Sequence, residues 1–211
     1  MAITIKDMLL TPNKWSRPQT KIGTIKNIVV HWIGNAGSTA ENNAKYFDSL
    51  KDGRGTYASS HYIIGNDGMV IRCVPENEVA YHASSANNYS IGIEVCHPDN
   101  TGKYTDEAYK ALIELLVDLC KRYKLEPTQA IIRHYDVSGK DCPRYYVKNT
   151  EAWKKLKQEV SDAMSRDEEL EYAVKVLQEK GVINSPEVWI RGNYSVSNVR
   201  ALVVKTANYI K

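Results

Sequence analysis

The chain has 211 residues, of which 43% are hydrophobic and 25% are charged, and its formal net charge is +3. This composition is typical of a folded protein with one ordinary domain plus a smaller one, and it excludes wholesale disorder. The small net charge and the lack of Lys/Arg blocks argue against a nucleic-acid-binding protein, and no apolar run approaches the ~18 residues of a membrane span.

The first three quarters of the chain alternate short apolar runs with segments of helical periodicity. The expected elements are a strand at 24–32, a helix at 39–51, a hairpin of 61–65 and 69–74 around a turn at 66–68, a strand at 90–96, a helix at 105–123, a strand at 130–133 and a helix at 150–164. The Asp-Gly pair indicates the hairpin, and apolar residues three and four apart indicate the helix at 105–123. Strands that alternate with helices predict an α/β core.

The last part of the chain predicts a small helical module. The charged stretch SRDEE at 165–169 is either a linker or a helix start, a helix should end near Gly181, and residues 196–210 should form a last amphipathic helix. We therefore expect two domains, at 1–164 and 165–211. A module of this length is near the lower limit for independent folding, so we expect it to pack on the core, to dimerise or to be modestly stable.

Four cysteines are present, and we expect no structural disulfides among them. Cys73, Cys96 and Cys120 lie in apolar runs and are interpreted as core residues. Cys142 differs, because it precedes a proline in the polar, turn-like stretch GKDCPRYY.

Three residues form a candidate metal site. His31 and His134 each lie at the end of a short apolar strand, and Cys142 follows His134 by eight residues. Two imidazoles and one thiolate suit zinc, with the fourth position left open as in a catalytic site. The alternative is that both histidines are ordinary strand-end residues and Cys142 is a small buried side chain.

Two charged residues are candidates for chemistry beside such a site. Glu94 lies inside the apolar run SIGIEVC, and strand alternation points it away from its neighbours Ile93 and Val95. It faces either solvent or a cleft, where it could serve as a general base. Lys140, two residues before Cys142, is either a solvated loop lysine or a donor to an oxyanion.

The segments NIVVHW, SSHYIIGNDG, YHA, SIGIEVC and HYDVSGKDCP occur in this order. Together they resemble the zinc-dependent N-acetylmuramoyl-L-alanine amidases of the type-2 amidase family, whose relatives include phage lysozyme-like amidases and peptidoglycan recognition proteins. The resemblance covers roughly residues 22–160. It implies a central mixed β-sheet flanked by helices, with a zinc ion (Zn²⁺) in a groove on one face.

The resemblance also implies a role for each candidate. His31, His134 and Cys142 match the family's zinc ligands. Glu94 matches the acid that activates the attacking water, and Lys140 matches the cation that stabilises the tetrahedral intermediate.

Three further positions are assigned less directly. Some phage members carry a catalytic tyrosine where this chain has Ser60, so that role falls to Glu94. His61 is interpreted as structural. His82, in YHA, lies where family members often line the substrate groove, and whether it contacts the substrate or the intermediate stays open.

The function implied is hydrolysis of the amide bond between N-acetylmuramic acid and the L-alanine of the stem peptide of bacterial peptidoglycan. We expect a phage or prophage endolysin, because residues 1–13 do not look like a signal peptide, so that the chain is made in the host cytoplasm and acts on the cell wall. The C-terminal module is expected to bind wall polymers or to form a homodimer. The alternatives are a bacterial autolysin, a peptidoglycan-recognition module without catalysis, and a zinc-stabilised structural protein.

Overall fold

The computed structural model describes residues 3–53, 55–190, 192 and 194–210, and the side chains of residues 165–168 lie outside this description. The chain divides into two compact units, Ile3–Ser161 and Asp162–Lys211. No helix among the described residues combines the length and the apolar character needed to cross a membrane.

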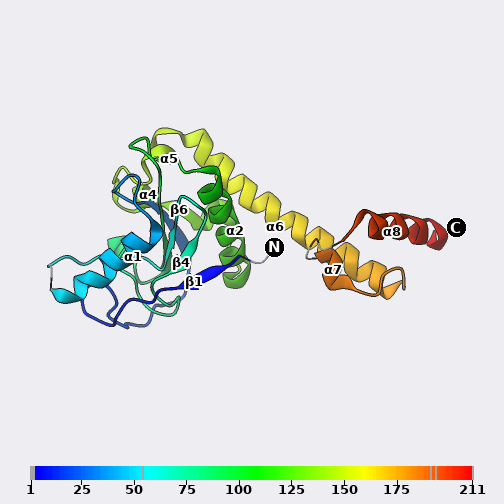
Figure 1. The fold of residues 1–211 in the computed structure, drawn as a ribbon, viewed down its shortest axis with the longest axis horizontal. Helices are drawn as coiled ribbons and strands as arrows, with labels where there is room; N and C mark the ends of the chain where they lie inside the picture. Colours follow the sequence, from blue (N-terminus) through cyan, green and yellow to red (C-terminus); the bar gives the residue numbers. More distant parts are fainter. Residues whose placement is uncertain (1–2, 54, 191, 193, 211) are drawn as a thin grey trace. The chain divides into compact units, whose positions relative to one another are not determined.

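The larger unit is built on one mixed sheet (Figure 1). Its six strands among the described residues are β1 (Ile5–Asp7), β2 (Asn27–Trp32), β3 (Tyr62–Ile64), β4 (Val70–Arg72), β5 (Ser90–Val95) and β6 (Ile131–Arg133). They lie in the order β1-β4-β3-β5-β2-β6, and only the β3–β4 pair is antiparallel. The β3–β4 hairpin turns at Asp67 and Gly68, where the positive φ of +80° favours glycine.

Helices cover both faces of this sheet. They are α1 (Ala40–Ser49), α2 (Asp106–Tyr123), α3 (Pro127–Ala130), α4 (His134–Ser138), α5 (Arg144–Lys148) and the first part of α6 (Thr150–Glu179), with short 3-10 turns η1 (Leu50–Asp52) and η2 (Ser84–Ala86). Figure 1 shows α1 and α2 on opposite faces. Thr105 caps α2 by accepting a hydrogen bond from the backbone N–H of Ala108.

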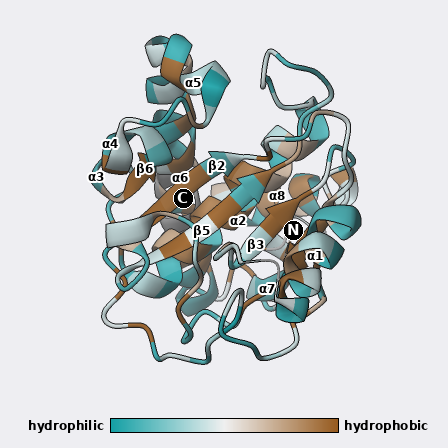
Figure 2. Cartoon of the chain, turned by 90° about the vertical axis from the view of Figure 1, so that its left-hand side faces the viewer, coloured by the Kyte–Doolittle hydropathy of each residue, from teal (hydrophilic) through white to brown (hydrophobic). Residues whose placement is uncertain are grey.

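The sheet is hydrophobic through its middle strands, as Figure 2 shows for β2, β3 and β5. Ile28, Val30, Ile91 and Ile93 are fully buried on one face. On the other face, Ile63 packs in a cluster with Ala44 and Phe47 of α1. His31 and Glu94 share this second face, because they are in register with each other and with Ile63. The polar residues of interest therefore lie on the α1 side of the sheet.

The predicted fold class is confirmed, and so is the order of its main strands and helices. One prediction is wrong: α6 runs unbroken from Thr150 to Glu179, so residues 165–169 are not a linker. Ser, Arg, Asp and Glu are all compatible with an exposed helix, and the stretch contains no glycine or proline to end it.

The Asp162–Lys211 unit contains the end of α6, together with α7 (Pro186–Ile190) and α8 (Val196–Tyr209). Val174, Val182 and Ile183 form its small buried cluster, against which Trp189 and Leu202 pack. Gly181 follows the end of α6 with a φ of +66°, in agreement with the expected helix end.

Candidate functional site

The strand register brings two histidines together at one edge of the sheet. Val30 on β2 pairs with Arg133 on β6, so the next residues, His31 and His134, emerge side by side. Their ring centroids are 4.7 Å apart. His31 is 1% exposed, whereas His134 opens α4 and is partly exposed. The rigidity of two adjacent strands thus fixes both imidazoles.

Cys142 reaches the same place from the segment between α4 and α5. The backbone N–H of Tyr135, next to His134, donates to the carbonyl of Cys142 over 2.8 Å. This bond ties the two segments together and leaves the Cys142 Sγ atom 3.8 Å from Nδ1 of His31. One ligand atom each from His31, His134 and Cys142 lies within 4.8 Å of the other two. We call these three residues the ligand trio.

Glu94 lies beside the trio, on the strand next to that of His31. Its Oε1 atom is 3.9 Å from Nδ1 of His31, and its side chain is 16% exposed. Its Oε2 atom is buried without a hydrogen-bond partner among the described residues. Burial raises the pKa of Glu94 to about 8, although the positive charge of Lys140 opposes this shift.

The protonation states of the trio suit a metal ion. Burial lowers the pKa of His31 and of His134, and nearby positive charge lowers both further, so each ring is neutral and has a lone pair to offer. Burial raises the pKa of the Cys142 thiol to about 12, with a further contribution from Glu94. The Nδ1 atom of His134 is buried without a partner among the described residues. A divalent cation would satisfy this nitrogen and hold the thiol as thiolate, so the donor set fits such an ion.

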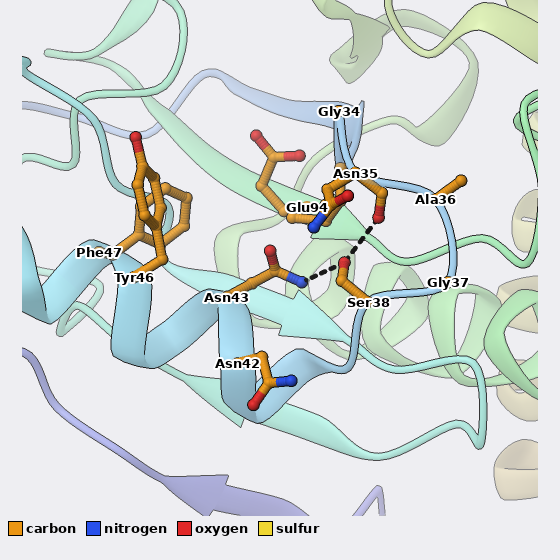
Figure 3. A pocket seen from close by; sticks show the side chains of 11 residues that line it. Gly34, Asn35, Ala36, Gly37, Ser38, Asn42, Asn43, Tyr46, Phe47 and Glu94 are labelled. Atoms are coloured by element: carbon orange, nitrogen blue, oxygen red, sulfur yellow. Dashed lines mark hydrogen bonds between the residues drawn. The ribbon is translucent and has the colours of Figure 1, made fainter.

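Two cavities adjoin Glu94. The first, of about 480 Å³, is lined by the ligand trio, Glu94 and Lys140, among other residues. The second, of about 580 Å³, lies between the loop at 34–38 and α1. Figure 3 shows Glu94 and Asn43 pointing into this second cavity, with Tyr46 and Phe47 to one side. Glu94 therefore borders both the ligand trio and the second cavity, which could hold part of a substrate.

The structure places His82 and His61 beneath the trio. The Nδ1 atom of His82 lies 3.1 Å from Nε2 of His31, and its Nε2 atom lies 3.4 Å from the carbonyl oxygen of Ser90. His61 is fully buried, and its Nδ1 atom accepts the backbone N–H of Gly92 over 2.9 Å. Ser60, at the position where some relatives carry tyrosine, is buried and donates to the carbonyl of Tyr62.

The first cavity is thus lined by all six residues that the sequence analysis proposed as metal ligands, catalytic groups or substrate contacts: His31, His82, Glu94, His134, Lys140 and Cys142. The structure also shows two features that the sequence analysis missed. One is the contact between His82 and His31, which no local spacing reveals. The other is the contribution of α1 to the second cavity through Asn43, Tyr46 and Phe47. The sequence predicted a helix here, but no pattern indicated that a cavity would form beside it.

The comparison with protein families identifies a match over most of the larger unit. Residues 21–145 match the profile of the family described as N-acetylmuramoyl-L-alanine amidase (Amidase_2). All members of the ligand trio, Glu94 and Lys140 lie within this range.

Individual relatives agree with the family match. The N-acetylmuramoyl-L-alanine amidase BlyA of Bacillus subtilis is 31% identical over 173 residues, which are 72% of this chain and 46% of BlyA. The catalytic domain of XlyA superposes with a TM-score of 0.62 at 25% identity, covering 75% of this chain and 99% of that domain. A mutant endolysin from Bacillus subtilis gives 0.63 at 25% identity, with the same coverage of both chains. The chain spans about half the length of the curated relatives it matches.

Proposed function

The chain belongs to the N-acetylmuramoyl-L-alanine amidase family, and on this premise we propose that it hydrolyses the amide bond between N-acetylmuramic acid and the L-alanine of the peptidoglycan stem peptide. The observation that carries the proposal is the ligand trio beside Glu94 in one cavity, within the range that the family profile matches. A water-accessible carboxylate next to a metal-binding trio is the arrangement that metal-assisted amide hydrolysis needs.

The metal is proposed to be zinc, held by His31, His134 and Cys142. Two imidazoles and a thiolate are a ligand set that zinc favours, and the described residues offer no fourth ligand within the same group. When bound in such a site, zinc acts as a Lewis acid toward the scissile carbonyl and makes water more acidic.

Glu94 is proposed to move the protons. Its carboxylate would take a proton from the attacking water while the water oxygen bonds to the carbonyl carbon. When the C–N bond breaks, the same group would pass a proton to the leaving nitrogen of L-alanine. The unpartnered Oε2 atom supports this role, because it leaves a carboxylate oxygen available to the attacking water. Burial raises the pKa of Glu94 to about 8 without a cation, and the positive charge of a bound metal ion would lower this pKa and favour the carboxylate.

Lys140 is proposed to stabilise the negative charge that develops on the carbonyl oxygen. It is exposed at the rim of the first cavity, in the segment that leads to Cys142. A fixed positive charge at that place favours the tetrahedral intermediate over the planar substrate amide.

The experiment that tests the function is mass spectrometry of the soluble products from Gram-positive cell walls incubated with the purified chain. We expect free stem peptides that begin at L-alanine, intact glycan, loss of the reaction with a chelator and recovery with zinc. Cleaved glycan or cut cross-bridges would contradict the proposed bond. If no product forms while the protein sediments with the walls, the chain is a recognition module instead.

Replacement of Glu94 tests the proposed base. Glu94→Ala should retain zinc and lose at least ~100-fold in turnover, because it removes the proton acceptor but none of the ligands. Zinc content and turnover on a soluble muropeptide are measured together. Glu107→Ala, which removes an exposed carboxylate from the first turn of α2, is the matched control. A Glu94→Ala enzyme with nearly normal turnover would refute the assignment.

The endolysin among the structural neighbours supports a phage or prophage endolysin over a bacterial autolysin. For residues 165–211 we propose a binding role toward wall polymers, with dimerisation as the alternative. The support is the apolar face of α8, where Val196 and Val203 are 88% and 61% exposed, together with Ile210, which follows the helix directly and is 78% exposed. Tyr194 of the same unit is 45% exposed and stacks on Trp189 with ring centroids 5.1 Å apart, and its ring is the aromatic surface proposed to meet a sugar.

A further inference from the structure

His82 connects a ligand of the metal site to the backbone of β5. Its Nδ1 atom faces Nε2 of His31 over 3.1 Å. Its Nε2 atom faces both oxygens of Ser90, the carbonyl and the hydroxyl, over 3.4 Å each. Both nitrogens of His82 are therefore used inside the protein, at a place where the sequence alone allowed a contact with substrate.

Ser90 determines which nitrogen of His82 carries the proton. The Ser90 hydroxyl donates its single hydrogen to the carbonyl of Ala86 over 2.6 Å. It therefore offers only lone pairs to His82, as does the Ser90 carbonyl. Because both neighbours are acceptors, the N–H of the neutral His82 ring lies on Nε2, and Nδ1 is left as an acceptor.

The same reasoning then fixes His31. Since Nδ1 of His82 accepts, Nε2 of His31 must donate, and the lone pair of the His31 ring lies on Nδ1. That atom is the one that faces Sγ of Cys142 at 3.8 Å and Oε1 of Glu94 at 3.9 Å. The opposite direction of the bond would place the N–H of His31 on Nδ1, where it would block metal coordination.

The surroundings of His82 hold its ring in this position. A Cβ atom on Gly92 would lie 2.4 Å from Cγ of His82 and 2.7 Å from its Nδ1, so the ring packs directly against the bare backbone of Gly92. The Asn87 side-chain oxygen accepts the backbone N–H groups of His82 and Ala83 over 3.0 and 2.7 Å. The edge of His61 meets the ring with centroids 5.8 Å apart.

We propose that His82 is a positioning residue, which accepts the Nε2–H of His31 and so presents the Nδ1 lone pair of His31 to the metal. Metal-binding histidines generally donate their second N–H to a partner that fixes the tautomer, most often a carboxylate or a carbonyl. Here a second histidine, His82, takes that place, and the tautomer of His82 is in turn fixed by Ser90. The inference rests on the metal site of the proposed function, but not on the bond that is cleaved.

The direct test is long-range ¹H–¹⁵N NMR of the metal-free wild-type chain, which distinguishes the two neutral histidine tautomers. We expect His31 and His82 both to carry their proton on Nε2. A His31 ring protonated on Nδ1 would overturn the proposal. This measurement needs no variant, so it remains decisive even if a replacement of His82 prevents folding.

A second test measures zinc affinity by competition with a chelator. His82→Ala should weaken zinc binding by roughly 10- to 100-fold, because His31 is then free to adopt the wrong tautomer. His82→Asn should recover most of this loss, since its side-chain oxygen can take about the position of Nδ1. Unchanged zinc affinity in His82→Ala, or a loss in His82→Asn as large as that in His82→Ala, would refute the positioning role.

The matched control is His97→Ala. His97 is also buried, and its ring nitrogens contact only the backbone carbonyls of Ile33 and Asp99 among the described residues. Its loss should lower stability but leave zinc affinity within about twofold of wild type. If the tautomers and affinities come out as expected while cell walls yield no stem peptides, the proposed function fails and the role of His82 stands.

Discussion

The thiol of Cys142 should make the proposed metal binding depend on pH. Burial raises its pKa to about 12 when no cation is present, so at neutral pH the thiol keeps its proton. A metal ion binds the thiolate and must displace that proton. Binding therefore releases at least one proton, and the affinity for zinc should fall as the pH falls, by roughly tenfold per pH unit for each proton released.

Calorimetric titration with zinc between pH 6 and 8, in two buffers of different ionisation enthalpy, measures both the affinity and the number of protons released. Cys142→Ser should bind zinc too weakly to follow under the same conditions. An affinity that does not change over this pH range would show that the thiol is already ionised in the metal-free protein.

Single residues differed in how well the sequence predicted them. His31, His134 and Cys142 could be selected as candidates from the sequence because each lies in a recognisable local pattern, a strand end or a turn before proline. Their meeting point depends on the β2–β6 register, which pairs Val30 with Arg133 across about 100 positions of chain. The role of His82 depends on its contact with His31, 51 residues away, and no period of 2 or 3.6 encodes such a contact.

Glu76 joins the β3–β4 hairpin to the end of α2. Its carboxylate accepts two hydrogen bonds from Arg122, at 2.6 and 2.8 Å, and one each from the hydroxyls of Tyr62 and Tyr123. Burial by itself would raise the pKa of Glu76, but these hydrogen bonds outweigh it and lower the pKa to about 2. The folded state thus prefers the ionised form.

Glu76→Gln should therefore destabilise the protein at neutral pH. The carboxylate contributes fully to the free energy of unfolding above the ordinary pKa of 4.5, and this contribution disappears as the pH falls from about 4.5 to about 2. The shift corresponds to roughly 3 kcal/mol at pH 7. Urea unfolding at pH 7 and at pH 2.5 gives the free energy of unfolding of wild type and variant. The effects of the other titrating groups cancel in the difference between the two proteins.

The expected difference is large at pH 7 and small at pH 2.5. Glu107→Gln, which changes an exposed carboxylate on α2, the helix that carries Arg122, should show little difference at either pH. Equal destabilisation by Glu76→Gln at both pH values would mean that the side chain contributes through its shape and not through its charge.

Elements were predicted where the sequence carries an apolar run, a helical period or a turn signal. The long helix α2 shows clear helical periodicity, the strands β2 and β5 are apolar runs, and the structure contains all three close to the expected bounds. The three-residue β1 and the helices α3, α4 and α5 of four or five residues are too short for any period to appear. The length of α6 was underestimated because a charged stretch was interpreted as a break, although charge alone does not end a helix.

The proposed site residues and the C-terminal helices belong to different units of the chain. The ligand trio, Glu94, Lys140 and His82 all belong to the Ile3–Ser161 unit. The Asp162–Lys211 unit has its own small cluster around Val174, Val182 and Ile183, and none of the proposed site residues lies in it. α6 contributes to both units, with Trp153, Leu156 and Val160 buried in its first part.

A chain that ends after residue 164 tests this separation. It keeps the buried residues of α6 up to Val160 and every proposed site residue, so it should cleave a soluble muropeptide at about the rate of the full chain. It should also be retained less by intact walls, because it lacks the exposed apolar face of α8.

The full chain with Val203→Glu is the matched variant, since it alters this face and leaves the rest of the chain in place. Sedimentation with walls, light scattering and turnover are measured for all three proteins. Weaker wall binding by both altered chains, with the number of protomers unchanged, would support a wall-binding unit, whereas a change from dimer to monomer would identify α8 as a dimer contact. If the shortened chain bound walls as well as the full chain did, the binding surface would lie within the catalytic unit itself.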